Sequence, residues 1–302
     1  MEGSVLTNQN LSDEIVAKPL RHVWRWVLGV VLVLAVYALC WSIATSPNID
    51  GAVFSRYLFN GLIIDGAVKT VWITAISMVI ATVLATLLAI MRLSTNPLLK
   101  GFSIAFVSFF RGTPLLLQIV FWGFLGLIWP TTTLGIPFTD IVFFQAKTSD
   151  VMSPIFAGII ALSLNEAAYA SEIVRAGILS VDVGQTEAAK SLGMGVGYSL
   201  RRIVLPQAMR VIIPPMGNET ISMLKSTAML SLVAVTELYT RAQIISATNY
   251  KQVELMAVAG FWYLVMNAIL AVPQSYLEHR YGKGVASQNE RWLNLPFKGL
   301  KR

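Results

Sequence analysis

Six long apolar segments alternate with shorter polar connections along the chain. A helix needs about 20 apolar residues to cross the hydrocarbon core of a bilayer. Each segment is long enough, so the pattern predicts an all-α integral membrane protein whose core is a six-helix transmembrane bundle. The expected spans are Val27–Thr45, Gly66–Met91, Phe102–Trp129, Pro154–Leu179, Ala208–Val235 and Leu255–Leu277.

The composition agrees with a membrane location. Hydrophobic residues make up 55% of the chain and charged residues only 13%, whereas about 25% charged residues is usual in soluble domains. The net charge of +7 does not indicate a nucleic-acid partner, because the basic residues lie mostly in the connections between apolar segments. We therefore expect membrane lipid, and no nucleic acid, as a partner. The single cysteine, Cys40, cannot form an internal disulfide, and no residue pattern indicates a metal site.

The basic residues also predict the orientation in the membrane. With both termini in the cytoplasm, most Lys and Arg residues fall on the cytoplasmic side, as the positive-inside rule requires. The resulting organisation is a cytoplasmic tail over residues 1–25, a first span over 26–45 and a basic cytoplasmic tail over 281–302 that could lie on anionic lipid. The longest outer connection, residues 130–153, is predicted to be a polar loop.

Several charged or polar side chains lie inside the predicted spans. A charge there costs about 2.5–3.5 kcal/mol on insertion scales, so these groups are expected to face protein or water. They either line a translocation path for a zwitterionic substrate or form ion pairs that hold the bundle together. Asn165, Tyr169 and Glu172 recur at helical spacing on one face, which we take to be the inward face. The complete set is Arg111, Asn165, Glu166, Tyr169, Glu172, Glu219 and Lys225.

Prolines interrupt two of these spans. Pro114 and the pair Pro214–Pro215 are predicted to break their helices within the membrane. Broken helices are tolerated there where they line a cavity or contact other protein, and a helix that starts after a break could offer backbone N–H groups to a substrate carboxylate. A plain kink that serves packing is the alternative interpretation.

The connection between the fourth and fifth spans has the clearest local signals. Asp182 is a good N-cap and Gln185 follows three residues later, so the pair predicts a capped helix. Gly193 is a natural helix stop, because it tolerates the left-handed backbone that commonly ends a helix. A second helical turn is expected over Tyr198–Val204, and Pro206 is expected to end it.

This connection resembles the signature loop of the permeases of ABC importers. The resemblance rests on a Glu-Ala-Ala triplet, a glycine after three intervening residues, and an Ile-x-Leu-Pro sequence after nine more intervening residues. In that family the short helix docks on a cytoplasmic ATPase and transmits its closure, so the resemblance implies an ATPase-coupling role for these positions. They are Glu187, Ala188, Ala189, Gly193, Ile203, Leu205 and Pro206.

Further segments resemble the permeases for polar amino acids of the histidine, glutamine and arginine type. They are Phe109–Leu115, Asn165–Glu172, Pro215–Glu219 and Leu224–Thr227. The resemblance covers roughly residues 61–280, the expected permease transmembrane domain. The chain departs from the group at its start, because members commonly have five spans and an outside N-terminus, and 26–45 is an added first span.

The resemblance implies a transporter subunit of the bacterial cytoplasmic membrane rather than an enzyme. Its implied partners are a pair of cytoplasmic ABC ATPases that bind ATP and Mg²⁺, a second permease subunit and an extracytoplasmic amino-acid-binding protein. No P-loop occurs in the chain, so no cofactor is expected here. An ion-coupled secondary transporter is the first alternative and an intramembrane enzyme the second, although no His-Glu-x-x-His or Gly-x-Ser-x-Gly sequence supports an enzyme.

Overall fold

A computed structural model describes residues 23–46, 49–136, 139 and 141–282. The chain divides into two compact units, residues 1–50 and 51–302, and each is described by itself. The predicted cytoplasmic tails lie almost wholly outside the described residues: only 23–25 of the first tail and 281–282 of the second are included.

In the described part of the first unit there is one apolar helix, α1 (Val23–Ala44). It coincides with the predicted added span over residues 26–45. Its described side chains are exposed, and its apolar core, Trp26–Leu39, is shorter than an 18-residue span. The structure therefore confirms a helix at this place and leaves its crossing of the membrane a prediction.

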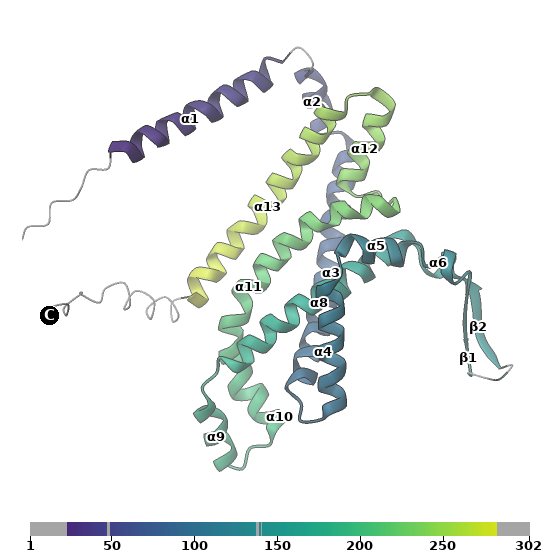
Figure 1. The fold of residues 1–302 in the computed structure, drawn as a ribbon, viewed down its shortest axis with the longest axis vertical. Coiled ribbons are helices and arrows are strands. Elements are labelled where there is room, and N and C mark those ends of the chain that lie inside the picture. Colours follow the sequence, from purple (N-terminus) through teal and green to yellow (C-terminus); the bar gives the residue numbers. More distant parts are fainter. Residues whose placement is uncertain (1–22, 47–48, 137–138, 140, 283–302) are drawn as a thin grey trace, which may run out of the picture. The chain divides into compact units, whose positions relative to one another are not determined.

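The second unit is a helical bundle with one small hairpin (Figure 1). The all-α prediction is thus confirmed apart from the hairpin. The elements in order are α2 (Gly51–Leu58), α3 (Gly61–Leu93), α4 (Pro97–Gly112), α5 (Leu115–Gly123), α6 (Leu125–Ile128), β1 (Thr131–Gly135), β2 (Val142–Lys147), α7 (Thr148–Val151), α8 (Pro154–Leu179), α9 (Val183–Ser191), α10 (Val196–Ser199), the π-helical turn η1 (Leu200–Val204), α11 (Leu205–Ser226), the 3₁₀ segment η2 (Thr227–Val233), α12 (Leu238–Asn249) and α13 (Gln252–Gly282).

Local sequence signals explain where the long helices begin. The side chain of Asn60 accepts a hydrogen bond from the Leu62 amide at the start of α3, and Asn96 accepts one from the Leu98 amide at the start of α4. Both caps satisfy backbone donors that have no partner within the helix. A proline in the first turn, where its missing N–H is not needed, begins α4 and α8. Helix α8 has the bounds predicted for the fourth span.

The core lies between helices that are distant in sequence. Helices α3 and α8 pack along much of their lengths, and α11 packs on α8 and α13. One buried apolar cluster includes Ile73, Ile119, Leu162 and Leu230. It joins α3, α5, α8 and η2, so the path of the chain between distant helices is fixed by the burial of their apolar faces.

A buried carboxylate ties the unpredicted helix α12 to the bundle. Glu237 is fully buried and caps α12 by accepting hydrogen bonds from the amides of Tyr239 and Thr240. Its second oxygen also accepts a hydrogen bond of 2.8 Å from the Tyr263 hydroxyl on α13. At the same end of the unit, Arg241 on α12 forms an ion pair of 2.9 Å with Asp65 on α3. These contacts fix α12 against both neighbouring helices.

The predicted count of six spans is not confirmed. Among the described residues, α3 and α13 are long and apolar enough to cross a bilayer alone. Two bent pairs bring the number to four if each pair is one span: α4 with α5, and the segment Val196–Val233 with α12. The polar residues embedded in α8 dilute its apolar character, although its 26 residues exceed the length that a bilayer requires.

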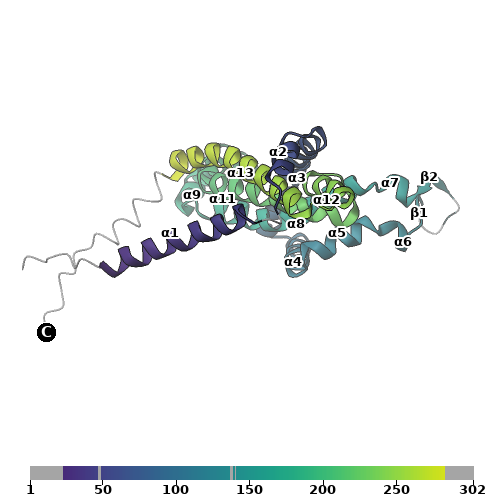
Figure 2. The same ribbon diagram turned by 90° about the horizontal axis from the view of Figure 1, so that it is seen from above.

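The connection 130–153 was predicted to be a polar loop, and this prediction is wrong. Strands β1 and β2 pair antiparallel there, with Thr131 opposite Lys147. Figure 2 shows the hairpin extending beyond α6 and α7, away from the bundle. Thr131–Thr133 and Val142–Phe144 are β-branched or aromatic residues that favour strands, and this local preference was overlooked among the polar neighbours.

Candidate coupling loop and translocation path

The predicted coupling helix forms as α9 and has a defined cap at each end. The Asp182 carboxylate accepts a hydrogen bond of 2.7 Å from the Gly184 amide, which confirms the N-cap. Gly193 has φ of 71°, so the predicted glycine stop is confirmed as well. The Gly193 amide donates to the Lys190 carbonyl and the Met194 amide to the Ala189 carbonyl. This pair of bonds is a Schellman motif, and it sets the direction in which the chain leaves α9.

The three residues of the Glu-Ala-Ala triplet face different surroundings. Glu187 and Ala188 are exposed, whereas Ala189 is only 1% exposed. Ala188 therefore lies on a surface that another protein can approach closely. Ala189 packs inside the loop itself, so its small size serves the internal packing of the loop.

The chain continues from the loop into α11 without a stop at Pro206. A helix end at Pro206 was predicted, and this prediction is wrong. The Leu205 amide bonds to the Leu200 carbonyl five residues earlier, which widens the turn to a π-helix. The wider turn and the position of Pro206 in the first turn of α11 accommodate a residue without an N–H donor. Ile203 and Leu205 are half-buried, so their side chains pack the junction between η1 and α11 against neighbouring residues.

The second expected break, at Pro214–Pro215, is also absent. Helix α11 runs through both prolines as one element, Leu205–Ser226. The side-chain amide of Gln274 on α13 donates a hydrogen bond of 2.7 Å to the Pro214 carbonyl. Gly217 makes room for this contact, because a Cβ atom there would lie 1.6 Å from Gln274 Oε1. Packing against α13 thus supports the helix across its prolines.

The break at Pro114 is confirmed. Helices α4 and α5 meet there at a bend of 99°, and Thr113 is extended, as expected for a residue before proline. The buried Gln118 side chain donates to the carbonyls of Phe110 (3.0 Å) and Thr113 (3.1 Å). Asn165 on α8 donates to the same Phe110 carbonyl at 3.1 Å and to Gln118 Oε1 at 3.2 Å. Side-chain amides thus replace the backbone donors lost at the bend.

This arrangement brings together three of the predicted path residues. Asn165 fixes α8 to the bend, while Arg111 and Tyr169 lie beside it. The Arg111 guanidinium stands over the Tyr169 ring, 5.1 Å from its centroid, and both side chains are exposed. A cation–π pair at an exposed site holds the guanidinium in place and leaves its N–H donors available to an anion.

The other predicted path residues lie apart from this group. Glu172 forms ion pairs with Arg175 at 2.7 Å and Arg92 at 3.7 Å, which matches the alternative interpretation of an ion pair that holds helices together. Lys225 is exposed on α11. Among the described residues, no group of three or more His, Cys, Asp or Glu side chains could hold a metal ion.

Two carboxylic acids of the predicted path lie deeper in the bundle. Glu166 on α8 is buried, and its Oε1 atom has no hydrogen-bond partner among the described residues. Glu219 on α11 is half-buried. A buried oxygen without a partner carries a desolvation cost, so Glu166 is a site where water or a substrate donor would be favourable.

The sequence interpretation missed Gln118 and Gln274. Both are amides inside apolar helices. Gln118 follows Pro114 by four residues and serves the Phe110 carbonyl that lost its donor, a local signal that could have identified it, whereas the contact of Gln274 with a distant helix has no such signal.

Comparison with known proteins shows the family to which the chain belongs. Residues 81–283 match the family described as binding-protein-dependent transport system inner membrane component. The chain belongs to this family. It is therefore a multi-pass permease subunit of an ABC importer, as the loop predicted, and not an enzyme. Membership also excludes the ion-coupled secondary transporter, and it implies an ATPase and a second permease as partners.

The relatives of this permease are transport proteins of the same kind. It is 42% identical to the arginine transport system permease protein ArgU of Corynebacterium glutamicum, over 89% of this chain and 84% of that protein. It is 37% identical to the L-cystine transport system permease protein TcyB of Bacillus subtilis, over 76% of this chain and 90% of that protein.

Solved structures of transporters share the fold. A crystal structure of an amino acid ABC transporter with histidines is 31% identical, with a TM-score of 0.63, and the match covers 75% of this chain and 97% of that chain. The MetNI methionine ABC transporter in an inward-facing conformation matches with a TM-score of 0.55 at 17% identity, over 73% and 96% of the two chains. This second likeness concerns the fold alone.

Proposed function

We propose that this permease imports polar amino acids and that α9 is the element through which a cytoplasmic ATPase drives it. The observation that carries the coupling proposal is the continuous helical path over α10, η1 and α11, which has no break at Pro206 or at Pro214–Pro215. The exposed, doubly capped α9 precedes this path and packs against α10 and η1. A displacement of α9 would therefore push on the start of the path and reach the membrane part of α11 as a movement of a rigid rod.

The amino-acid substrate is supported by the relatives and by the bend at Pro114. Relatives are named for arginine, L-cystine and glutamine transport. Arg111 presents an exposed guanidinium whose geometry suits a carboxylate, and Tyr169 and Asn165 hold the surrounding helices in place. Glu166 and Glu219, with an unpartnered oxygen on Glu166, would suit the ammonium group. Together they would recognise a zwitterion, with Glu172 and Lys225 contributing less directly.

The other subunits of the transporter follow from this role. We propose that the permease assembles with a pair of ATPases that hold ATP and Mg²⁺, a second permease copy or homologue, and an extracytoplasmic amino-acid-binding protein. The permease domain extends over residues 61–280, with residues 26–45 as an added span and both termini in the cytoplasm. A reporter active only outside the cell, fused after Arg302, would stay silent in this orientation, and a strong signal would contradict it.

Uptake by the reconstituted complex tests the substrate. Proteoliposomes with the permease, its ATPase and its binding protein would be given labelled arginine, glutamine and cystine, and Arg111→Ala would be compared with Lys100→Ala, an exposed cation on α4. We expect saturable uptake of at least one amino acid, lost in Arg111→Ala while ATP hydrolysis continues and unchanged in Lys100→Ala. An assembled, hydrolysing complex that carries none of them would contradict the proposed substrate class.

A further inference from the structure

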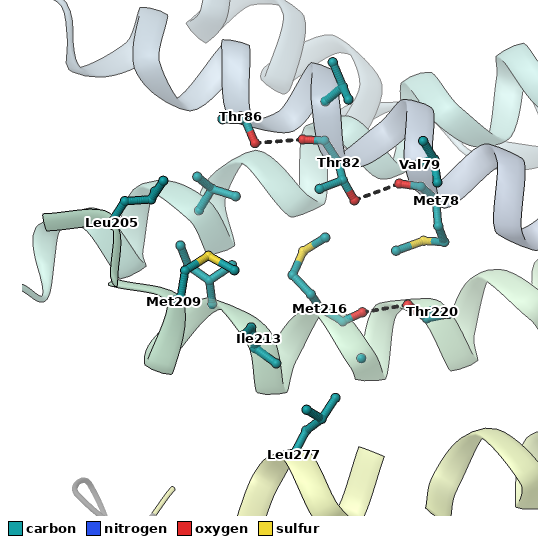
Figure 3. Close-up of a pocket in the computed structure, with 14 residues that line it drawn as sticks. Met78, Val79, Thr82, Thr86, Leu205, Met209, Ile213, Met216, Thr220 and Leu277 are labelled. Atoms are coloured by element: carbon teal, nitrogen blue, oxygen red, sulfur yellow. Dashed lines mark hydrogen bonds between the residues drawn. The ribbon is translucent and has the colours of Figure 1, made fainter. Parts of the chain in front are cut away.

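An apolar groove of about 540 Å³ lies between α3, α11 and α13. Figure 3 shows Leu205 and Met209 at one end and Thr220 at the other, with Leu277 of α13 on the side opposite α3. No charged side chain lines it. Such a groove in a membrane protein must be filled by protein or by lipid, because apolar surface in contact with water is costly.

The few polar groups in the groove are already satisfied by their own helices. The hydroxyl of Thr82 donates to the Met78 carbonyl at 2.7 Å, and that of Thr86 to the Thr82 carbonyl at 2.8 Å. On the facing helix, the Thr220 hydroxyl donates to the Met216 carbonyl at 2.9 Å (Figure 3). A polar solute such as an amino acid would find no free donor here. The groove therefore suits a hydrocarbon chain, and its flexible methionines can adapt to one.

The groove is long enough to span one leaflet of a bilayer. Its lining on α11 extends from Leu205 to Thr220, which is about 22 Å at 1.5 Å per residue. Half of a hydrocarbon core is about 15 Å thick. One acyl chain of a phospholipid would fit along it, and the exposed sides of Val79 and Val83 leave the groove open for lateral entry.

Positive charge lies at one end of the groove. Arg210 lies about 20° around α11 from Gly217, a lining residue, so it stands at the edge of the groove. Helical side chains lean toward the N-terminus of their helix, which points Arg210 toward the end where Leu205 lies. Arg210 is exposed and has no ion pair or hydrogen bond within the described part of the chain. Arg280, also exposed, follows Leu277 by less than one turn of α13, and one of its guanidinium nitrogens donates a hydrogen bond of 3.2 Å to the Tyr276 hydroxyl.

We propose that the groove binds an anionic phospholipid, with an acyl chain between α3 and α11 and the headgroup phosphate at Arg210 and Arg280. The charge complementarity favours an anionic over a zwitterionic lipid, because one unpaired guanidinium near a membrane surface strengthens anionic binding about fivefold. The site is separate from the exposed pair of Arg111 and Tyr169 at the α4–α5 bend, and it does not depend on which substrate the transporter carries.

Native mass spectrometry of the purified transporter complex tests the site. The complex would be titrated with phosphatidylglycerol and, separately, with phosphatidylcholine of the same acyl chains. Arg210→Gln removes the proposed headgroup contact, and Lys100→Gln removes an exposed cation outside the groove. Val83→Trp fills the groove, while Leu87→Trp places the same side chain at an exposed α3 position that does not line it.

We expect Arg210→Gln to weaken phosphatidylglycerol binding about fivefold and to leave phosphatidylcholine binding unchanged. Lys100→Gln and Leu87→Trp should change neither, and Val83→Trp should reduce the adducts of both lipids. Equal binding of the two lipids by the unaltered complex, or an unchanged phosphatidylglycerol affinity in Arg210→Gln, would overturn the proposal. The same spectra report subunit number, so a Val83→Trp complex that loses a permease copy would assign the groove to a second chain and would overturn it too.

Discussion

The two proline sites of the bundle show opposite outcomes of the same chemistry. Pro114 separates α4 from α5 at a bend of 99°, whereas α11 continues through Pro214 and Pro215. At the bend, Gln118 donates to the Phe110 carbonyl, which lost its donor at Pro114, whereas Gln274 of a different helix gives the Pro214 carbonyl an added bond between α11 and α13. The difference teaches that a proline in a membrane helix removes a donor and crowds the carbonyl four residues before it, and that the surrounding packing decides whether the helix bends or continues.

The outcome matters for transport because the two sites would have different tasks. The bend at Pro114 has exposed Arg111 beside it, in contact with Tyr169 on α8. The unbroken α11 joins the coupling loop to the middle of the bundle. In the proposed function the bend would hold a substrate contact and α11 would transmit movement, and both tasks would require a fixed geometry, so disturbing either amide should be costly.

The largest effect is expected for Gln118→Leu. The substitution removes the donors to the Phe110 and Thr113 carbonyls and to Thr113 Oγ1, and it removes the acceptor of Asn165. At about 1–3 kcal/mol for a buried polar group left unsatisfied, the loss should reach roughly 3 kcal/mol. The measurement is the midpoint of thermal unfolding of the purified complex. Gln207→Leu, at an exposed amide whose side chain bonds to the Ile203 carbonyl one turn earlier, should change the midpoint little, and equal midpoints for both variants would refute the role of Gln118.

A smaller loss is expected for Gly217→Ala. The new Cβ would lie 1.6 Å from Gln274 Oε1, so the Gln274 side chain must move and give up its bond to the Pro214 carbonyl. Overpacking of this kind costs about 1–3 kcal/mol. Gly112→Ala beside the Pro114 bend is the matched control, since nothing lies within 4 Å of its added Cβ. If the two variants unfold at the same temperature, the close approach of α11 and α13 is not as described.

The smallest effect is expected for Gln274→Ala, and this substitution should remove the difference between Gly217→Ala and Gly112→Ala. The single substitution loses the bonds to the Pro214 carbonyl and to Glu278, a net loss of about 1 kcal/mol. In this background Gly217→Ala meets no Gln274 amide, so it should then cost almost nothing. A double-mutant cycle of unfolding midpoints measures this coupling, and strictly additive losses would argue against direct contact.

The sequence predicted those features that depend on neighbouring residues. Asp182 and Gly193 lie at the ends of α9 as expected, because caps are local, and Thr113–Pro114 bends as the residue pair requires. Gln274, which bonds to the Pro214 carbonyl, lies 60 residues further along the chain, and no local pattern reveals that contact. The burial of Ala189 likewise depends on how the loop folds back on itself.

The candidate translocation path likewise depends on contacts that local sequence patterns do not reveal. Helical spacing placed Asn165, Tyr169 and Glu172 on one face of α8, and two of them do meet the α4–α5 bend. Glu172 instead pairs with Arg92 of α3, because the packing of α3 on α8 brings an opposite charge within reach. Spacing along one helix cannot tell which neighbouring helix supplies a partner.

The number of amino acids imported per ATP hydrolysed, in proteoliposomes containing the whole transporter, tests the central claim most directly. Ala188→Asp places a charge on the exposed face of α9, and Thr95→Asp places one on the exposed α3–α4 connection. The account predicts that Ala188→Asp loses uptake, either because the ATPase no longer co-purifies or because hydrolysis continues without import, and that Thr95→Asp keeps the normal ratio. A normal ratio in Ala188→Asp would contradict the assignment of α9 as the coupling element.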